Sequence, residues 1–438
     1  MRALRSLRLL AVVALALVAA AAAAAPLAHR EVLPNGIRLL VAERPAIPIV
    51  VVRVSLRAGS VFDPADGEGL ANLTADLLTR GTAKRTGPEL DRAIEFVGGS
   101  LEADAGKDGV TVSLAVLKKD LALGLDLLAE VLREPAFPED ELKRRVAEVQ
   151  AALKRSEENP ETVAGRALGQ ALYPGHPYAH PTQGTIESVG KITREQVLRF
   201  HREHYRPDAA VVAVVGDVTR DEIRRELGAR LGGWAAPAGA RAAVPSAIAV
   251  LPPAITRTLT RELTQATVYM GRPAIRQDHP DYFPLVLANY VLGGGSASRL
   301  YTRVREERGL AYSIYSSLSP ARYGASFVVG LQTRNEGVDE AMRLAKEEMS
   351  RMGREHVTAA ELDLARAYLI GSFPLRMDTS GKVARLMIAV EEYGLGLDYP
   401  DRYKERIGRV TAADVQRVAA RYLDPATFSV ITVRGKSN

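Results

Sequence analysis

The stretch ITREQVLRFHREHYRPDAAVVAVVG, residues 192–216, returns in outline as VTAADVQRVAARYLDPATFSVITVRG, residues 410–435. Each copy runs from a β-branched residue and a threonine, through an amphipathic helical pattern, to a tyrosine, a proline and a β-rich run that ends in glycine. Both threonines are candidate N-caps, with Gln196 and Asp414 three residues further on. A constant offset favours duplication of one unit, with two unrelated helix–strand units as the alternative. The identities at this offset pair Val197, Arg199 and Pro207 with Val415, Arg417 and Pro425.

Strand and helix patterns alternate in both halves of the chain around this repeat. Residues 30–42 predict a β-hairpin. Residues 232–253 contain four prolines and three glycines with little periodicity, so they predict a linker. We therefore predict an α+β fold of two duplicated halves, residues 29–231 and 254–438, each an antiparallel sheet with helices packed on one face.

The first 25 residues have the composition of an export signal. Arg2, Arg5 and Arg8 precede a short apolar run and a series of alanines, so we predict a signal peptide over residues 1–25 and a periplasmic location. An uncleaved membrane anchor is the alternative. The formal charge of +6 falls to +3 without these three arginines, which is too weak to indicate nucleic-acid binding.

The absence of cysteine excludes several kinds of chemistry. The 438 residues include no cysteine, so disulfides, thiol catalysis and zinc–thiolate sites are ruled out. A cysteine-free exported chain fits an oxidising compartment. Its stability must come from burial of the core.

A second informative stretch is AGSVFDPADGEGLANLTADLLTRGT, residues 58–82. Residues 68–80 predict an amphipathic helix that Gly81 can end. Positions 72, 75 and 76 leave such a helix on one face, as two metal ligands and a general base would. The predicted buried side consists of Leu70, Leu73, Leu77 and Leu78.

This stretch resembles the active-site helix of the inverzincin family, which includes pitrilysin, insulinase and the mitochondrial processing peptidase. In that family G-L-A-H-x-x-E-H carries two histidine ligands and a glutamate base. Asn72, Ala75 and Asp76 stand at those three positions here. The family's third ligand, a glutamate in a segment shaped Glu-x5-(Asp/Glu)-Asn-Pro, falls on Ala152, ahead of residues 158–160. The resemblance implies a degenerate zinc site, with no catalytic residue, metal or cofactor in this chain.

A rebuilt metal site is the alternative reading of these positions. Glu148 lies one turn before Ala152, so Asn72, Asp76 and Glu148 could form an oxygen-rich site for a hard cation. Ordinary polar residues beside a cleft are the simpler interpretation. We expect backbone or water partners, or surface and capping roles, for His176, His180, His201 and His204.

The second half carries the other match to the family. Residues 292–315 read LGGGSASRLYTRVREERGLAYSIY and are similar to a segment of the family's C-terminal domain. In the family, an arginine and a tyrosine seven residues later face the zinc across the chamber and hold the substrate. The resemblance assigns these substrate-binding roles to Arg305 and Tyr312, whose fixed donors suit a developing oxyanion. A surface ion pair for Arg305 and simple packing for Tyr312 are the alternative.

The combination of lost ligands and a retained arginine–tyrosine pair resembles the non-catalytic subunit of heterodimeric members of the family. It implies two clam-like halves, an unfolded peptide substrate, and a homologous partner subunit that carries H-x-x-E-H and the zinc. It also implies that the chain is inactive as a peptidase on its own. Two alternatives remain: a stand-alone peptide-binding or scaffold protein, and a peptidase with non-standard metal ligands.

Overall fold

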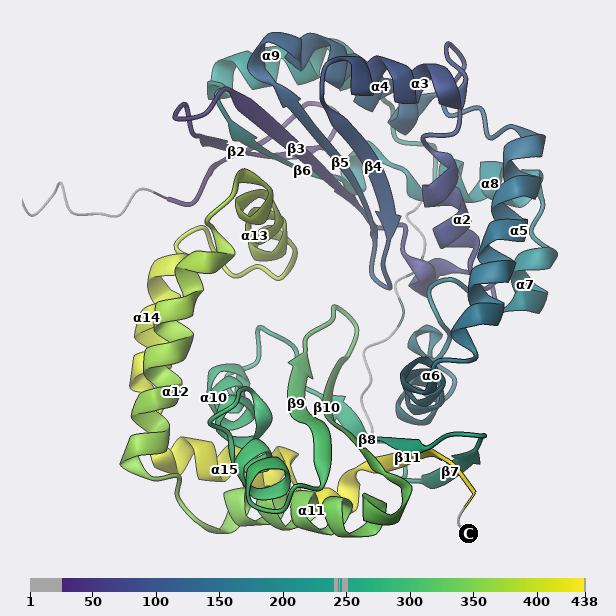
Figure 1. Ribbon diagram of the computed structural model, residues 1–438. Helices are drawn as coiled ribbons and strands as arrows, with labels where there is room; N and C mark the ends of the chain where they lie inside the picture. The colour runs from purple at the N-terminus through teal and green to yellow at the C-terminus, as the bar shows by residue number, and fades with distance from the viewer. Residues whose placement is uncertain (1–25, 240–242, 244, 246–250, 437–438) are drawn as a thin grey trace, which may run out of the picture.

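The computed structural model describes residues 26–239, 243, 245 and 251–436. Two β-sheets face each other, and helices cover their outer sides (Figure 1). The predicted signal peptide and part of the predicted linker lie outside the described residues. In spatial order the first sheet contains β1 (His29–Val32), β2 (Arg38–Glu43), β6 (Val211–Gly216), β3 (Ile49–Leu56), β5 (Val110–Leu117) and β4 (Ser100–Ala105). The second contains β7 (Thr256–Thr260), β11 (Ser429–Arg434), β8 (Gln265–Ala274), β10 (Ala325–Arg334) and β9 (Ala311–Ser319).

Apart from β1, which forms the predicted hairpin with β2, the two sheets have the same strand order. The predicted α+β fold with duplicated halves is confirmed. One correction concerns the sheets, which are not wholly antiparallel, because each contains one parallel pair: β2 with β6 and β7 with β11. These pairs arise because β6 and β11 each enter the sheet after a helix and not through a hairpin.

The repeated unit forms the same structure twice. Helix α8 (Arg194–His204) leads into β6, and α15 (Ala412–Tyr422) leads into β11. Both helices begin with the predicted reciprocal caps. The backbone N–H of Thr193 donates to Gln196 at 2.8 Å, and that of Thr411 donates to Asp414 at 3.0 Å.

Each sheet buries its outer face under helices of its own half. In the first half alternate residues of β3 and β5 point into this core, for example Val52, Val54 and Val112. None of the helices in the described residues is both long enough and apolar enough to span a bilayer. The covering helices include α3 (Gly87–Phe96), α4 (Leu121–Arg133) and α9 (Arg220–Leu231) in the first half, and α10 (Tyr282–Gly293), α11 (Val338–Arg354) and α15 in the second. Helices α12 (Ala359–Ser372) and α14 (Tyr399–Arg409) pack on each other and on α10, beside the second sheet (Figure 1).

A group of helices packs together beside β4 in the first half. Helix α2 contacts β4, α8 and α5, and α5 contacts α7 (Figure 1). The predicted active-site helix therefore lies between the edge of the sheet and the helix that carries the third ligand position. The bounds of these helices are Leu70–Leu77 for α2, Glu139–Ser156 for α5 and Ile186–Gly190 for α7.

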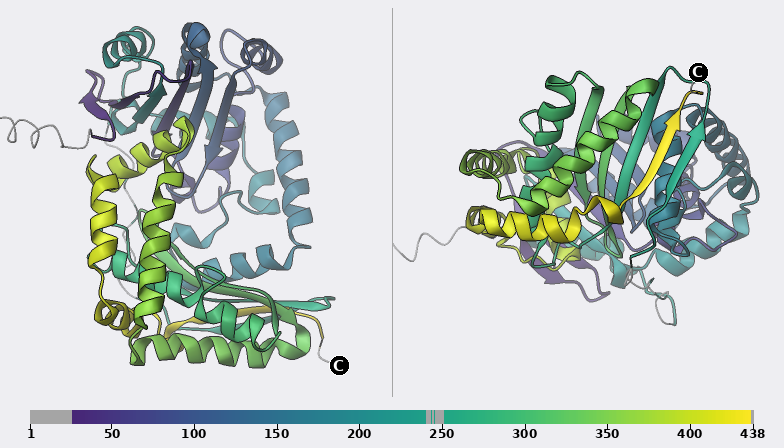
Figure 2. Two further views of the ribbon diagram at one scale, coloured as in Figure 1. Left: turned by 60° about the vertical axis from the view of Figure 1, so that its left-hand side comes forward. Right: turned by 90° about the horizontal axis from the view of Figure 1, so that it is seen from below.

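The two halves exchange one helix each across their inner faces, which are the sheet faces turned toward the other half. Helix α6 (Pro160–Leu172) of the first half packs on β8 and β11, and α13 (Ser380–Glu392) of the second half packs on β3 and β6 (Figure 1 and Figure 2). Buried apolar side chains form the centre of both contacts. Leu168 is buried in one cluster with Ile431, and Met387 is buried in another with Val215. The exchange fixes the position of one half relative to the other.

Polar contacts join the tips of equivalent hairpins from the two halves. The backbone N–H of Arg322, in the β9–β10 turn, donates to Asp108 of the β4–β5 turn at 2.9 Å. The hydroxyl of the buried Tyr178 bonds to the same carboxylate and accepts the backbone N–H of Tyr323 at 3.1 Å. The two sheets are therefore connected at their hairpin tips as well as through the exchanged helices.

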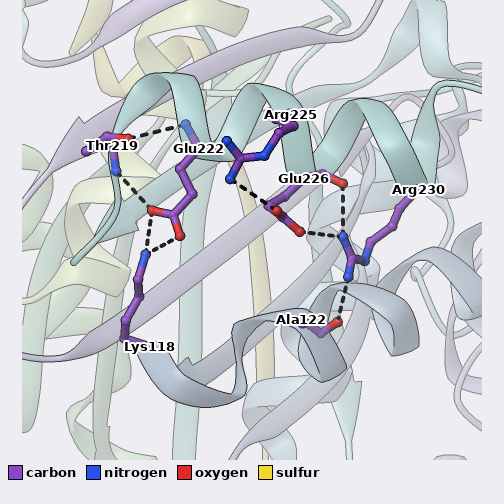
Figure 3. A network of polar contacts seen from close by, with 7 residues as sticks. All are labelled: Lys118, Ala122, Thr219, Glu222, Arg225, Glu226 and Arg230. Atoms are coloured by element: carbon purple, nitrogen blue, oxygen red, sulfur yellow. Dashed lines mark hydrogen bonds and ion pairs between the residues drawn. The ribbon is translucent and has the colours of Figure 1, made fainter.

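Helix α9 is fastened to the outside of the first sheet by a chain of charged contacts (Figure 3). Glu222 caps the helix with Thr219 and accepts both bonds from Lys118, which follows β5. At the other end, Arg230 donates to Glu226 at 2.7 Å and to the carbonyl of Ala122 in α4 at 3.4 Å. Partly exposed pairs of this kind contribute about 0–1 kcal/mol each, so they orient the helix more than they stabilise it.

Candidate functional site

The predicted active-site helix is shorter than its sequence pattern. Helix α2 begins at Leu70, because Gly69 has a φ of +96° and cannot continue a right-handed helix. The predicted leucines are all buried, so the orientation of the helix is as expected. Asp63 accepts the backbone N–H groups of Gly69 at 2.8 Å and Ala71 at 2.7 Å and so holds the start of α2. Burial raises the pKa of Asp63 to about 7, although the two amides oppose this rise.

The helix presents an ion pair where a metal site would have its ligands. Three donor nitrogens surround Oδ2 of Asp76: Nε of Arg145 at 2.9 Å, Nη2 of the same arginine at 2.8 Å, and the amide of Asn72 at 3.0 Å. The Asp76 side chain is 17% exposed. Burial raises the pKa of Asp76, and both Arg145 and Asn72 oppose that rise. Ala75 is fully buried and carries no group that could accept a proton.

Arg145 comes from α5, the helix that also carries the third ligand position. Arg145 also donates to Glu148 at 3.0 Å, and this hydrogen bond lowers the pKa of Glu148. Ala152 lies two turns further along α5 and is partly buried. The structure thus brings Asp76 and Glu148 together, as the alternative of a hard-cation site required. The group that lies between the two carboxylates is the guanidinium of Arg145.

Zinc does not fit this set of residues. Positions 72, 75 and 152 offer an amide and two methyl groups, and the carboxylate at position 76 already has three donors. A divalent cation at Asp76 would meet the fixed positive charge of Arg145 at hydrogen-bond distance from that carboxylate. Among the described residues, no group of three or more His, Asp or Glu side chains is arranged to hold a metal ion. Arg145 was missed by the sequence reasoning, although it lies on the same face of α5 as Ala152, two turns earlier.

The histidines have local structural roles. His176 accepts the backbone N–H of Tyr178 at 3.0 Å, as expected for a loop histidine. The prediction of surface or capping roles is wrong for His204, which is buried against the rings of Phe62 and Phe200. His201 bonds to a backbone carbonyl, and burial lowers its pKa to about 4. The misprediction arises because the segment of Phe62 packs on α8, a contact that a helical pattern alone does not reveal.

Arg305 and Tyr312 lie in the second half, around the start of β9. Arg305 is in a π-helical turn, Tyr301–Glu306, that packs on β9, and its guanidinium lies 4.9 Å from the centre of the Tyr301 ring. Tyr312 is the extra residue of a β-bulge, because Ala311 pairs with Thr333 and Ser313 with Gln332. The Tyr312 side chain is 54% exposed. Neither Arg305 nor Tyr312 has a side-chain hydrogen bond or ion pair within the described part of the chain.

The sheets end in strands that are paired on one side. Among the described strands, β4 pairs only with β5, and β9 only with β10. Helix α2 packs beside β4, so the ion pair of Asp76 and the free edge of the first sheet lie close together. An unpaired edge strand can add an extended peptide through backbone hydrogen bonds.

Both halves of the chain match models of one peptidase family. Residues 38–186 match the model described as insulinase (peptidase family M16), and residues 191–369 match the peptidase M16 inactive domain. An uncharacterized zinc protease of Mycobacterium leprae is 31% identical over 406 residues, which cover 90% of this chain and 89% of the relative. A non-peptidase homolog of Helicobacter pylori is 26% identical over 415 residues, covering 94% of this chain and 95% of the relative. The matches therefore include proteins named as peptidases and a protein named as a non-peptidase.

Solved structures share the fold over nearly the whole chain. A peptidase M16 inactive domain from Pseudomonas fluorescens superposes with a TM-score of 0.89 at 27% identity and covers 94% of this chain and 98% of its own. A protease from Helicobacter pylori, at 20% identity and a TM-score of 0.85, covers 93% and 99% and has the same fold. The arrangement of the two halves is thus that of proteins already seen in crystals.

Proposed function

Because the chain belongs to the insulinase family of M16 peptidases, we propose that it is the non-catalytic, substrate-binding subunit of a zinc metallopeptidase heterodimer. The observation that carries this proposal is the ion pair between Arg145 and Asp76, which stands where the family holds zinc. An internal guanidinium is incompatible with a metal at the same carboxylate. The chain alone is then inactive as a peptidase.

The arginine and tyrosine of the second half support a role in substrate binding. Arg305 and Tyr312 are exposed and keep their donors free of intrachain acceptors within the described residues. In the proposed complex they would donate to the backbone of a peptide held near the partner's site. Each of these donors would stabilise the negative charge that develops on the peptide carbonyl, as the preorganised donors of an oxyanion hole do.

The proposed substrate is an unfolded peptide. The free edge of β4 can hold an extended segment, and the inner face beside it carries polar side chains, including Glu102 and Ser113. The proposed partner is a homologous subunit with an intact H-x-x-E-H helix that carries the zinc. We place the complex in the periplasm because residues 1–25 have the composition of a signal peptide.

Co-expression with a zinc-bearing homologue from the same organism tests the proposal. The pair should cleave an unstructured peptide, and Arg305→Ala or Tyr312→Phe in this chain should lower kcat about 10²- to 10³-fold, the usual effect of losing one such donor. The matched control is Arg303→Ala, which removes a neighbouring arginine that is paired with Glu307. Full activity of both variants would remove the assigned role of the pair, and metal-dependent cleavage by the isolated chain would overturn the proposal as a whole.

A stand-alone peptide-binding protein is the second candidate. It is favoured by the similarity to a relative named as a non-peptidase homolog. The two candidates differ in one measurement: the stand-alone protein elutes as a single subunit when mixed with the zinc-bearing homologue, whereas the heterodimer subunit elutes with it. The third reading, a peptidase with non-standard ligands, requires Arg145 to leave Asp76.

A further inference from the structure

Two arginines lie where the exchanged helix α13 crosses the inner face of the first sheet, Arg53 on β3 and Arg385 on α13. Two contacts fix how this helix lies over the sheet. At its C-terminal end, Glu392 accepts the hydroxyl of Ser55, near the end of β3, at 2.7 Å. Before its N-terminal end, the carbonyl of Met377 accepts a bond at 3.3 Å from Arg44, which follows β2. Because β2 runs opposite to β3, Arg44 lies near the start of β3, and α13 therefore runs in the same direction as β3.

This arrangement places Arg385 beside Arg53. Arg385 precedes Glu392 by seven residues, which is two helical turns, so both leave the same face of α13. Two helical turns rise about 10 Å, which is also the length of about three residues of a β-strand. Arg385 therefore lies level with the part of β3 that is about three residues before Ser55. Arg53 lies two residues before Ser55 and points to the same inner face.

Other arginines close to α13 have acidic or carbonyl partners on that helix. Arg30 and Arg38 bond to Glu391, and Arg322 bonds to the carbonyl of Glu392. Within the described residues, Arg53 and Arg385 have no hydrogen-bond, ion-pair or ring partner. Burial lowers the pKa of Arg53, and the nearby positive charge of Arg385 lowers it further.

The acidic groups that act on Arg53 from the same face form no ion pair with it. Asp104 and Glu102 raise its pKa, in opposition to burial and to Arg385. Both carboxylates are on β4, and β5 lies between β4 and β3, so the two strands are about 10 Å apart. Ser113, directly across from Arg53 on β5, is partly exposed and adds a hydroxyl to the surface between them.

We infer that Arg53 and Arg385, with Ser113, form a subsite for a carboxylate of the bound peptide. Two guanidinium groups without partners, one of them half-buried, offer the fork geometry and positive charge that a carboxylate takes up. The carboxylate is a free C-terminus or an Asp or Glu side chain. The inference rests on the proposed peptide-binding function and adds a charge preference to it.

Peptide binding to the full chain tests this subsite. The probe is an unstructured, N-acetylated ten-residue peptide of Ser, Ala and Val with an internal fluorophore, prepared as the C-terminal acid, as the amide, and as the amide with a final Glu. By fluorescence anisotropy, the acid should bind about tenfold more tightly than the plain amide, as charge-assisted hydrogen bonds allow. The Glu-bearing amide distinguishes a side-chain carboxylate from a free C-terminus as the group that is held.

Arg53→Gln and Arg385→Gln should each bring the preference for the acid to within about twofold, with the affinity for the plain amide unchanged. The matched control is Arg92→Gln, which removes an exposed positive charge from the outer helix α3. Thermal melting verifies that the variants fold. A preference for the acid that survives both substitutions overturns the subsite, and so does an equal loss of affinity for acid and amide. If the wild-type chain binds none of the peptides, the proposed function itself fails.

Discussion

Replacing Arg145 by methionine should destabilise the first half of the protein. The side chain of Asp76 is 17% exposed and would keep one donor, Asn72, of the three that now surround it. Hydrogen bonds to charged groups contribute roughly 1.5–3 kcal/mol, and breaking a fully buried pair costs about 3–5 kcal/mol. Because Arg145 is 36% exposed, water replaces part of the interaction, and we expect a loss of about 2 kcal/mol.

Urea denaturation followed by tryptophan fluorescence measures the loss in the free energy of unfolding of the first half. The single tryptophan, Trp234, is buried in the core of the first half. A loss of about 2 kcal/mol should lower the urea midpoint by roughly 1 M. The matched control is Arg144→Met on the same helix, because Arg144 is 50% exposed and its pairs contribute below about 1 kcal/mol.

A second variant separates the ion pair from the packing of the arginine stem. Adding Asp76→Asn to Arg145→Met removes the uncompensated carboxylate, so most of the lost stability should return. Equal midpoints for Arg145→Met and Arg144→Met would refute the reasoning. So would a double variant that is as unstable as Arg145→Met, because the loss would then come from packing alone.

The altered zinc position and the partly buried His201 give two more tests. A variant with the zinc ligands restored by Asn72→His, Asp76→His and Ala152→Glu should bind zinc weakly while Arg145 is present. Adding Arg145→Met should raise the zinc affinity, measured by calorimetry, at least about tenfold. Equal zinc affinities of the two variants would show that the guanidinium group does not block the site. The pKa of His201 is lowered by burial to about 4, below the ordinary value of 6.5, so between these values the unfolded chain binds the extra proton and stability should rise with pH. His201→Gln should flatten the change in urea midpoint between about pH 4.5 and 7, and an unchanged slope would contradict the assignment.

The repeat and the caps of its helices could be predicted from the sequence because they are local. Thr193 and Thr411 cap helices whose hydrogen bonds close within four residues, so residue types at fixed spacing determine them. The buried leucines of α2 were predicted for the same reason, since their spacing defines one face. The start of α2 was not, because the left-handed conformation of Gly69 depends on Asp63 holding the backbone of that turn.

The contacts between distant elements could not be predicted from pattern alone. An amphipathic helix shows which of its faces is buried, but not which sheet buries it, so the exchange of α6 and α13 between the halves is invisible in the periodicity. Arg145 meets Asp76 only because α5 packs on α2. The same limit applies to Arg53 and Arg385, which come from different halves and meet through the exchanged helix.

Arg145 and Arg53 differ in what surrounds each of them in the folded protein. Arg145 lies within the first half and satisfies a carboxylate of that half, so its charge contributes to folding and is closed to a ligand. Arg53 is brought beside a second arginine by a helix from the other half, so the folded state holds two like charges together and gains nothing from the pair itself. An arrangement that raises the energy of the free protein is relieved when an anion binds between the two charges. The two sites are therefore complementary. The ion pair of Arg145 and Asp76 excludes the metal ion that would polarise a reacting carbonyl, whereas Arg53 and Arg385 would hold a carboxylate of the peptide in place.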